Sequence, residues 1–116
     1  MDESQLKYHH LGIPMIEPRA GEEYIPDYKM YVQGFSSSRF GIEWMRFEAG
    51  CTLPALVKTM PHIAFQVNDV WEAIKGQKVL IEPNSPSPGV LVAFIEENGL
   101  PIEFIQFAEQ TSGEKV

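Results

Sequence analysis

The sequence predicts a small α+β protein that has many strands, few helices and two similar halves. Three observations favour this fold class. Residues 62–67 alternate apolar side chains with polar or small ones and run directly into a helix signal. Asn98-Gly99 separates two apolar segments in the way that a hairpin turn does. One short pattern of residues also occurs twice along the chain, in the same order.

Length and composition predict a single domain over residues 1–116. The chain has 44% hydrophobic and 22% charged residues, values that are typical of globular proteins. We expect two half-modules at about residues 7–50 and 61–107, followed by a polar tail at 109–116.

Charge and cysteine content narrow the choice of partners. The net charge of −7 repels phosphate backbones, so no nucleic-acid partner is expected. No membrane partner is expected either, since no apolar run reaches ~18 residues and the first residues lack the pattern of a secretion signal. Cys51 is alone, which excludes an internal disulfide and favours a cytoplasmic protein. Small molecules, metal ions and other proteins remain as partners.

The first half is expected to contain three strands joined by irregular segments. Residues 7–13 form a strand with His10 and Gly12 on one face and Leu11 and Ile13 on the other. The prolines of residues 14–27 predict an irregular excursion. The remaining expected elements are strands at 29–33 and 40–48, a turn at 34–38, and a helical turn within 53–59.

The second half is expected to contain a strand, a helix and three further strands. Asp69 is placed to cap a helix at 70–75, with Glu72 three positions later to close a capping box. A strand at 79–82 and a loop at 84–89 follow. The last two strands, 90–96 and 101–107, form a hairpin that places Phe94 opposite Glu103.

The repeated pattern brings candidate metal ligands together. His10-Leu11-Gly12-Ile13 matches His62-Ile63-Ala64-Phe65, and Ile42-Glu43-Trp44-Met45 matches Ile102-Glu103-Phe104-Ile105. Both histidines lie opposite the apolar face of their strand, next to a very small residue that leaves space. Two such half-sites that face each other would bring His10, His62 and two carboxylates to one point. This ligand set suits a divalent ion such as Zn²⁺, Ni²⁺, Co²⁺, Mn²⁺ or Fe²⁺.

Three segments resemble the vicinal oxygen chelate superfamily, which includes glyoxalase I, methylmalonyl-CoA epimerase, extradiol dioxygenases and bleomycin-resistance proteins. The segments are residues 9–13, 61–70 and 92–103. The resemblance implies two βαβββ modules whose curled mixed sheets form a cup, with His10, Glu43, His62 and Glu103 as metal ligands. The first module departs from this pattern: Pro14-Met15-Ile16-Glu17-Pro18 stands where a capped helix is usual, so this module is abbreviated. Glu48 would replace Glu43 if the strand contained a bulge.

The resemblance implies a small glyoxalase-like, metal-dependent lyase or isomerase that acts on a small carbonyl compound through a metal-bound enediolate. Glu43 or Glu103 would act as the base. Arg39, Arg46 and Lys58 are candidates to hold an anionic substrate. His9 is expected to point away from the site, unless the register shifts by one residue. A homodimer is expected by resemblance.

Three alternatives remain at this point. One is a non-catalytic small-molecule binding protein of the bleomycin-resistance type, with an apolar ligand between Trp44 and Phe94. Another is an extradiol-dioxygenase-like oxygenase, which needs two histidines and one carboxylate. The third is an interaction module whose sheet edge pairs with another chain.

Overall fold

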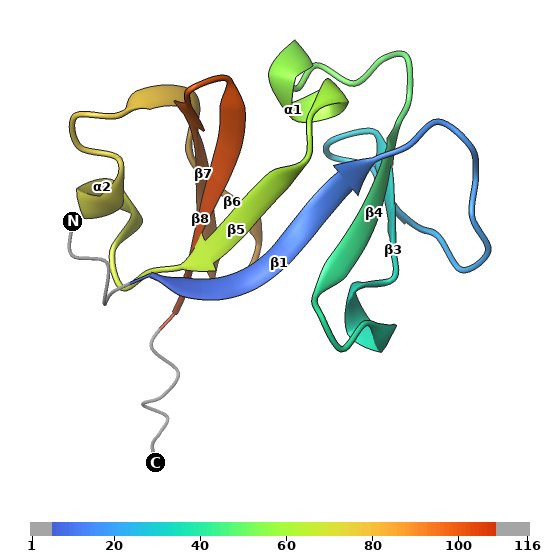
Figure 1. The fold of residues 1–116 in the computed structure, drawn as a ribbon, viewed down its shortest axis with the longest axis horizontal. Coiled ribbons are helices and arrows are strands. Elements are labelled where there is room, and N and C mark those ends of the chain that lie inside the picture. Colours follow the sequence, from blue (N-terminus) through green and yellow to red (C-terminus); the bar gives the residue numbers. More distant parts are fainter. Residues whose placement is uncertain (1–5, 109–116) are drawn as a thin grey trace.

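In the computed structural model, which describes residues 6–108, eight strands form one curled mixed sheet (Figure 1). The strand order is β2-β3-β4-β1-β5-β8-β7-β6. The strands are β1 (Lys7–Pro14), β2 (Glu23–Ile25), β3 (Met30–Gln33), β4 (Ile42–Phe47), β5 (His62–Gln66), β6 (Lys78–Ser87), β7 (Val90–Glu97) and β8 (Leu100–Phe107). The short helices are η2 (Phe35–Ser37), α1 (Ala55–Thr59) and α2 (Val70–Ala73). The predicted α+β class is confirmed, whereas the predicted tail at 109–116 lies outside the described residues.

The sheet consists of two similar halves. In the first half β1 runs parallel to β4, and in the second half β5 runs parallel to β8. The halves join where β1 and β5 pair antiparallel, in the middle of the view in Figure 1. A helix, α2, follows β5, whereas the segment between β1 and β2 contains none. The prediction of an abbreviated first module that lacks a clear helix is therefore confirmed, since the one helix between β1 and β4 is the three-residue η2.

Strand register reproduces the repeat in the sequence. Gly12 pairs with Glu43 across β1 and β4, and Ala64 pairs with Glu103 across β5 and β8. Across the junction, Gly12 pairs with His62 and His10 pairs with Ala64. Each half therefore places its histidine beside the small residue of the other half.

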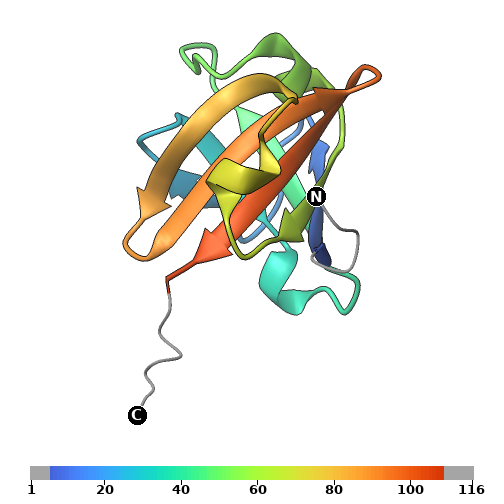
Figure 2. The same cartoon turned by 90° about the vertical axis from the view of Figure 1, so that its left-hand side faces the viewer.

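Helix α2 covers the outer side of the second half (Figure 2). Its buried residues Val70 and Ala73 pack against residues of β7 and β8, namely Ala93, Ile95 and Phe104. The predicted cap is present, because Asp69 Oδ1 accepts a hydrogen bond from the Glu72 backbone N–H at 3.3 Å. The Glu72 carboxylate, which was predicted to close a capping box with Asp69, pairs with Lys75 at 3.1 Å.

The β7–β8 hairpin has the predicted register. Phe94 pairs with Glu103 and Glu97 pairs with Leu100. Asn98 and Gly99 both have positive φ angles, 51° and 88°, as a two-residue type I′ turn requires. Glu103 therefore faces the inner side of the sheet at a position that the sequence defines.

Two expected connections contain strand structure. The irregular segment at 14–27 includes β2, and most of the loop expected at 84–89 belongs to β6. Pro83 and Pro86 are tolerated within β6 because this strand lies at the edge of the sheet and pairs on one side only. The register of β6 against β7 shifts three times along its length. No helix within residues 6–108 has the length and apolar character needed to cross a membrane.

Candidate functional site

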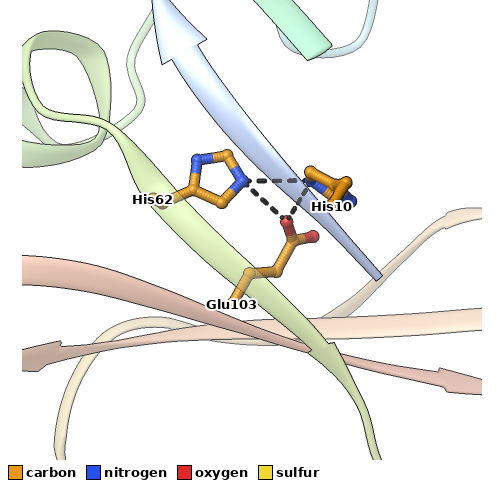
Figure 3. A group of neighbouring side chains, drawn as sticks. All are labelled: His10, His62 and Glu103. Carbon is orange, nitrogen blue, oxygen red and sulfur yellow. Dashed lines mark hydrogen bonds and ion pairs between the residues drawn. The ribbon is translucent and has the colours of Figure 1, made fainter. Parts of the chain in front are cut away.

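Two histidines and one glutamate converge on the inner side of the sheet (Figure 3). His10 Nε2 lies 3.2 Å from His62 Nε2 and 3.3 Å from Glu103 Oε1. His62 Nε2 lies 3.0 Å from Glu103 Oε1. The three residues come from β1, β5 and β8, three neighbouring strands of the sheet. We call them the His10–His62–Glu103 cluster.

Space for the cluster depends on Gly12. A Cβ atom at Gly12 would lie 2.7 Å from His62 Nδ1 and 2.9 Å from His62 Nε2, inside van der Waals contact. Phe94 packs edge-on against the His62 ring, with centroids 5.1 Å apart. His62 Nδ1 is a buried atom without a hydrogen-bond partner among the described residues. Packing and the contacts of Nε2 therefore hold this ring in place.

The cluster is buried and electrostatically coupled. His10, His62 and Glu103 are 6%, 3% and 9% exposed. Burial alone would raise the pKa of Glu103, but hydrogen bonds and charge interactions with the two histidines lower it to about 2. Burial would lower the pKa of His10, but its hydrogen bond to Glu103 and the charges of Glu103 and Glu43 raise it. The carboxylate form of Glu103 is thus stabilised inside an apolar environment.

Glu43 lies beside the cluster rather than within it. Its Oε1 is 3.7 Å from His10 Nε2. The potential ligand atoms of the His10–His62–Glu103 cluster all lie within 4.8 Å of one another, and Glu43 does not belong to this set. Burial raises the pKa of Glu43, although His10 partly opposes this. Glu48 does not compete for the position, because it accepts a hydrogen bond from the Tyr24 hydroxyl at 2.8 Å.

The cluster and Glu43 line a cavity of about 270 Å³ between the two halves of the sheet. Strands of both halves supply apolar side chains to its walls, including Met30, Val32, Met45, Ile81, Val92, Phe94 and Ile105. Leu53 and Val57, from the segment that contains α1, add a further wall. Trp44 was expected to line the cavity with Phe94, but it does not. Side chains alternate between the two faces of a strand, and the neighbours of Trp44, Glu43 and Met45, both face the cavity.

Solved structures with the same architecture are known. A hypothetical protein from Bacillus halodurans C-125 has a TM-score of 0.67 and 20% identity, and the match covers 90% of this chain and 96% of that chain. A methylmalonyl-CoA epimerase from Mycobacterium tuberculosis has a TM-score of 0.63 and 17% identity over 97% of this chain and 96% of that chain. Methylmalonyl-CoA epimerases are members of the vicinal oxygen chelate superfamily. This chain has the vicinal oxygen chelate fold. No family model and no curated protein matches the sequence.

The vicinal oxygen chelate fold of this chain contains a third histidine in the site. His9 was expected to point away, and this expectation is wrong, because the register between β1 and β5 shifts between Tyr8 and His10. His9 lines the cavity, and its Nδ1 lies 2.8 Å from His10 Nδ1. Its ring stacks on Phe35, with centroids 5.0 Å apart and planes 15° apart. The His9-His10 pair was visible in the sequence, but the shift that turns His9 inward was not.

The donor set of the His10–His62–Glu103 cluster fits a metal ion. Atoms bound to one ion at about 2.1 Å lie about 3.0–3.4 Å apart. The three separations within the cluster, 3.0, 3.2 and 3.3 Å, agree with this spacing. The Nδ1 atoms of His9 and His10 share a hydrogen bond. When the N–H at His10 Nδ1 is the donor, His10 Nε2 carries no proton and can offer its lone pair to a metal ion. The cluster could therefore hold a divalent ion.

Proposed function

We propose that the chain binds a divalent first-row metal ion through His10, His62 and Glu103, and that it is a lyase or isomerase that moves a carbon-bound proton of a small carbonyl compound. The observation that carries this proposal is the convergence of two imidazoles and one carboxylate at the wall of an apolar cavity, with Glu43 adjacent. A bound ion would supply Lewis acidity that stabilises negative charge developing on the oxygens of the substrate.

Glu43 is the favoured base. It faces the cavity, lies 3.7 Å from His10 and has a pKa that burial raises, so its carboxylate accepts a proton more readily than an exposed one does. Glu103 has the opposite character, because the histidines hold its pKa at about 2. Glu103 would hold the ion, while Glu43 would take the proton from carbon and return it. The sequence alone had left the base open between these two residues.

Metal analysis and proton exchange test the proposal. We expect about one divalent ion per chain in protein purified without chelator, and loss of that ion in His62→Ala. Glu48→Gln is the matched control, since that carboxylate bonds to Tyr24 outside the cavity. The metal-loaded protein should exchange the carbon-bound proton of small α-hydroxyketones with deuterium oxide. The proposal would be contradicted if the wild-type protein contained no metal after incubation with each candidate ion.

An extradiol-type oxygenase is a second candidate, because the cluster consists of two histidines and one carboxylate. If the chain is an oxygenase, the iron-loaded protein should consume oxygen in the presence of a catechol, and Glu43→Gln should retain this activity. If the chain is a lyase or isomerase, neither result is expected. The homodimer, the cytoplasmic location and the single domain over residues 1–116 stay predictions.

Metal affinity should decrease as the pH is lowered. An ion and a proton compete for His10 Nε2, and the pKa of His10 is raised above its ordinary value of 6.5. The fall should therefore begin above pH 6.5, while Glu103 stays ionised down to about pH 2. Competitive titration with a chromogenic chelator between pH 5.5 and pH 8.5 measures this dependence. An affinity that is constant over that range would show that His10 is not a ligand.

His9 should act as a positioning residue. His9→Phe keeps an aromatic ring against Phe35 but removes the Nδ1 partner of His10. We expect roughly 10- to 100-fold weaker metal binding, as for other partners of metal-bound histidines. Thermal unfolding of the metal-free variant provides the control. Equal metal affinity in the variant and the wild type would show that the contact between His9 and His10 is incidental.

A further inference from the structure

No lysine or arginine side chain within residues 6–108 lines the cavity. The three residues considered for anion binding are engaged elsewhere: Arg46 binds both carboxylate oxygens of Glu22, Arg39 lies over the Phe40 ring, and Lys58 donates to the Cys51 carbonyl. None of these three candidates for holding an anionic substrate therefore reaches the cavity.

Two carboxylates face the cavity. Glu43 and Glu103 line it, and the histidines already interact with Glu103. In the metal-free protein, an anionic ligand would leave water for an apolar space that holds no lysine or arginine of residues 6–108 as a counter-charge, which costs several kcal/mol. The same space carries no such cost for a neutral apolar compound.

Size further limits the ligand. A cavity of about 270 Å³ lies at the low end of the range of about 300–1,000 Å³ for drug-sized ligands. The apolar side chains that line it come from both halves of the sheet. A compound with a single ring or a short branched chain fits this volume, whereas a nucleotide does not.

Tyr28 and Asn84 add a neutral polar contact. The Tyr28 hydroxyl donates to Asn84 Oδ1 at 2.7 Å, which joins the β2–β3 turn of one half to β6 of the other. Both residues line the cavity. They offer hydrogen bonds to a hydroxyl or carbonyl group of a ligand without adding charge.

From these observations we infer that the walls of the cavity favour neutral, largely apolar compounds over compounds that carry a carboxylate or a phosphate. Where the proposed function holds, the carbonyl substrate is uncharged outside the oxygen atoms that the ion would bind. The charge selectivity belongs to the walls of the cavity, so it is present without a metal ion.

Two probes that differ in charge test this inference. Methyl benzoylformate and benzoylformate share a phenyl ring and two adjacent carbonyl groups, but only the second is an anion. Titrations followed by NMR in metal-free protein, at pH 8 with chelator, should show at least tenfold tighter binding of the ester. Equal or tighter binding of the anion, or no binding of the ester, would overturn the inference. Because no metal is present, the result stands apart from the test of the proposed function.

A gain-of-function variant identifies the cause of the selectivity. Leu53 is a half-buried cavity residue outside the helices and strands, so Leu53→Lys should be tolerated. We expect Leu53→Lys to bind benzoylformate at least fivefold more tightly than the wild type does. Leu53→Met is the matched neutral control and should keep the preference for the ester. Unchanged affinity of Leu53→Lys for the anion, in a variant whose NMR spectrum shows a folded protein, would overturn the inference.

Discussion

Gly12→Ala is expected to weaken metal binding by roughly 100-fold. Overpacking a buried site costs about 1–3 kcal/mol, and a 100-fold loss corresponds to the upper part of this range. The added methyl group would lie 2.7–2.9 Å from the ring nitrogens of His62. The His62 ring must then rotate, and because Nδ1 has no partner among the described residues, no second hydrogen bond opposes the rotation. His62 Nε2 would leave its place 3.0 Å from Glu103. Isothermal titration with zinc measures the loss.

Ala64→Gly is the matched control for Gly12→Ala, because Ala64 occupies the same position in the other half and pairs with His10. Removing the Ala64 methyl group creates space near His10 instead of a clash. We expect metal affinity close to that of the wild type and a lower free energy of unfolding, by about 1 kcal/mol. Similar metal affinities for Gly12→Ala and Ala64→Gly would show that the space at Gly12 does not position His62.

Glu103→Gln and Glu43→Gln are expected to separate metal binding from proton transfer. Glu103→Gln removes the charge between two buried histidines and should weaken metal binding by roughly 1,000-fold, since breaking a buried charge pair costs about 3–5 kcal/mol. Glu43→Gln should change metal affinity less than about tenfold. Its deuterium-exchange rate should instead fall by about 10²–10⁴, the usual contribution of a general base.

The two measurements are made on the same preparations, with metal content determined before the exchange assay. Glutamine has nearly the shape of glutamate, so packing changes little and charge is the main difference. Metal loss in Glu43→Gln equal to that in Glu103→Gln would restore the four-ligand site that the superfamily resemblance implies. Full exchange activity in metal-loaded Glu43→Gln would remove Glu43 from the role of base.

Much of the site follows from local patterns in the sequence. Strand alternation, with the small residues Gly12 and Ala64, placed His10 and His62 on the inner side of the sheet. The Asn98-Gly99 turn determined the register of β7 against β8 and therefore the position of Glu103. The repeat predicted two half-sites that face each other with both histidines at one point, and His10 Nε2 lies 3.2 Å from His62 Nε2. Whether these residues bind a metal stays a prediction.

Features that depend on long-range packing were not accessible from the sequence. The register shift that turns His9 inward arises between β1 and β5, which are distant in the chain. Pro86 and Pro88 suggested a loop at 84–89, yet β6 extends to Ser87. Only the position of β6 at the edge of the sheet makes Pro86 acceptable in a strand. The separation of Glu43 from the cluster depends on side-chain positions that no periodicity encodes.

The junction of β1 and β5 has a mechanical consequence. If the halves twist against each other about this line, an atom is displaced in proportion to its distance from it. His10 and His62 sit on the line itself and keep their separation, whereas Tyr28 and Asn84 lie on the β2–β3 turn and on the edge strand β6 and would separate first. Such a twist would break the hydrogen bond between Tyr28 and Asn84 while the distance between His10 and His62 changed little.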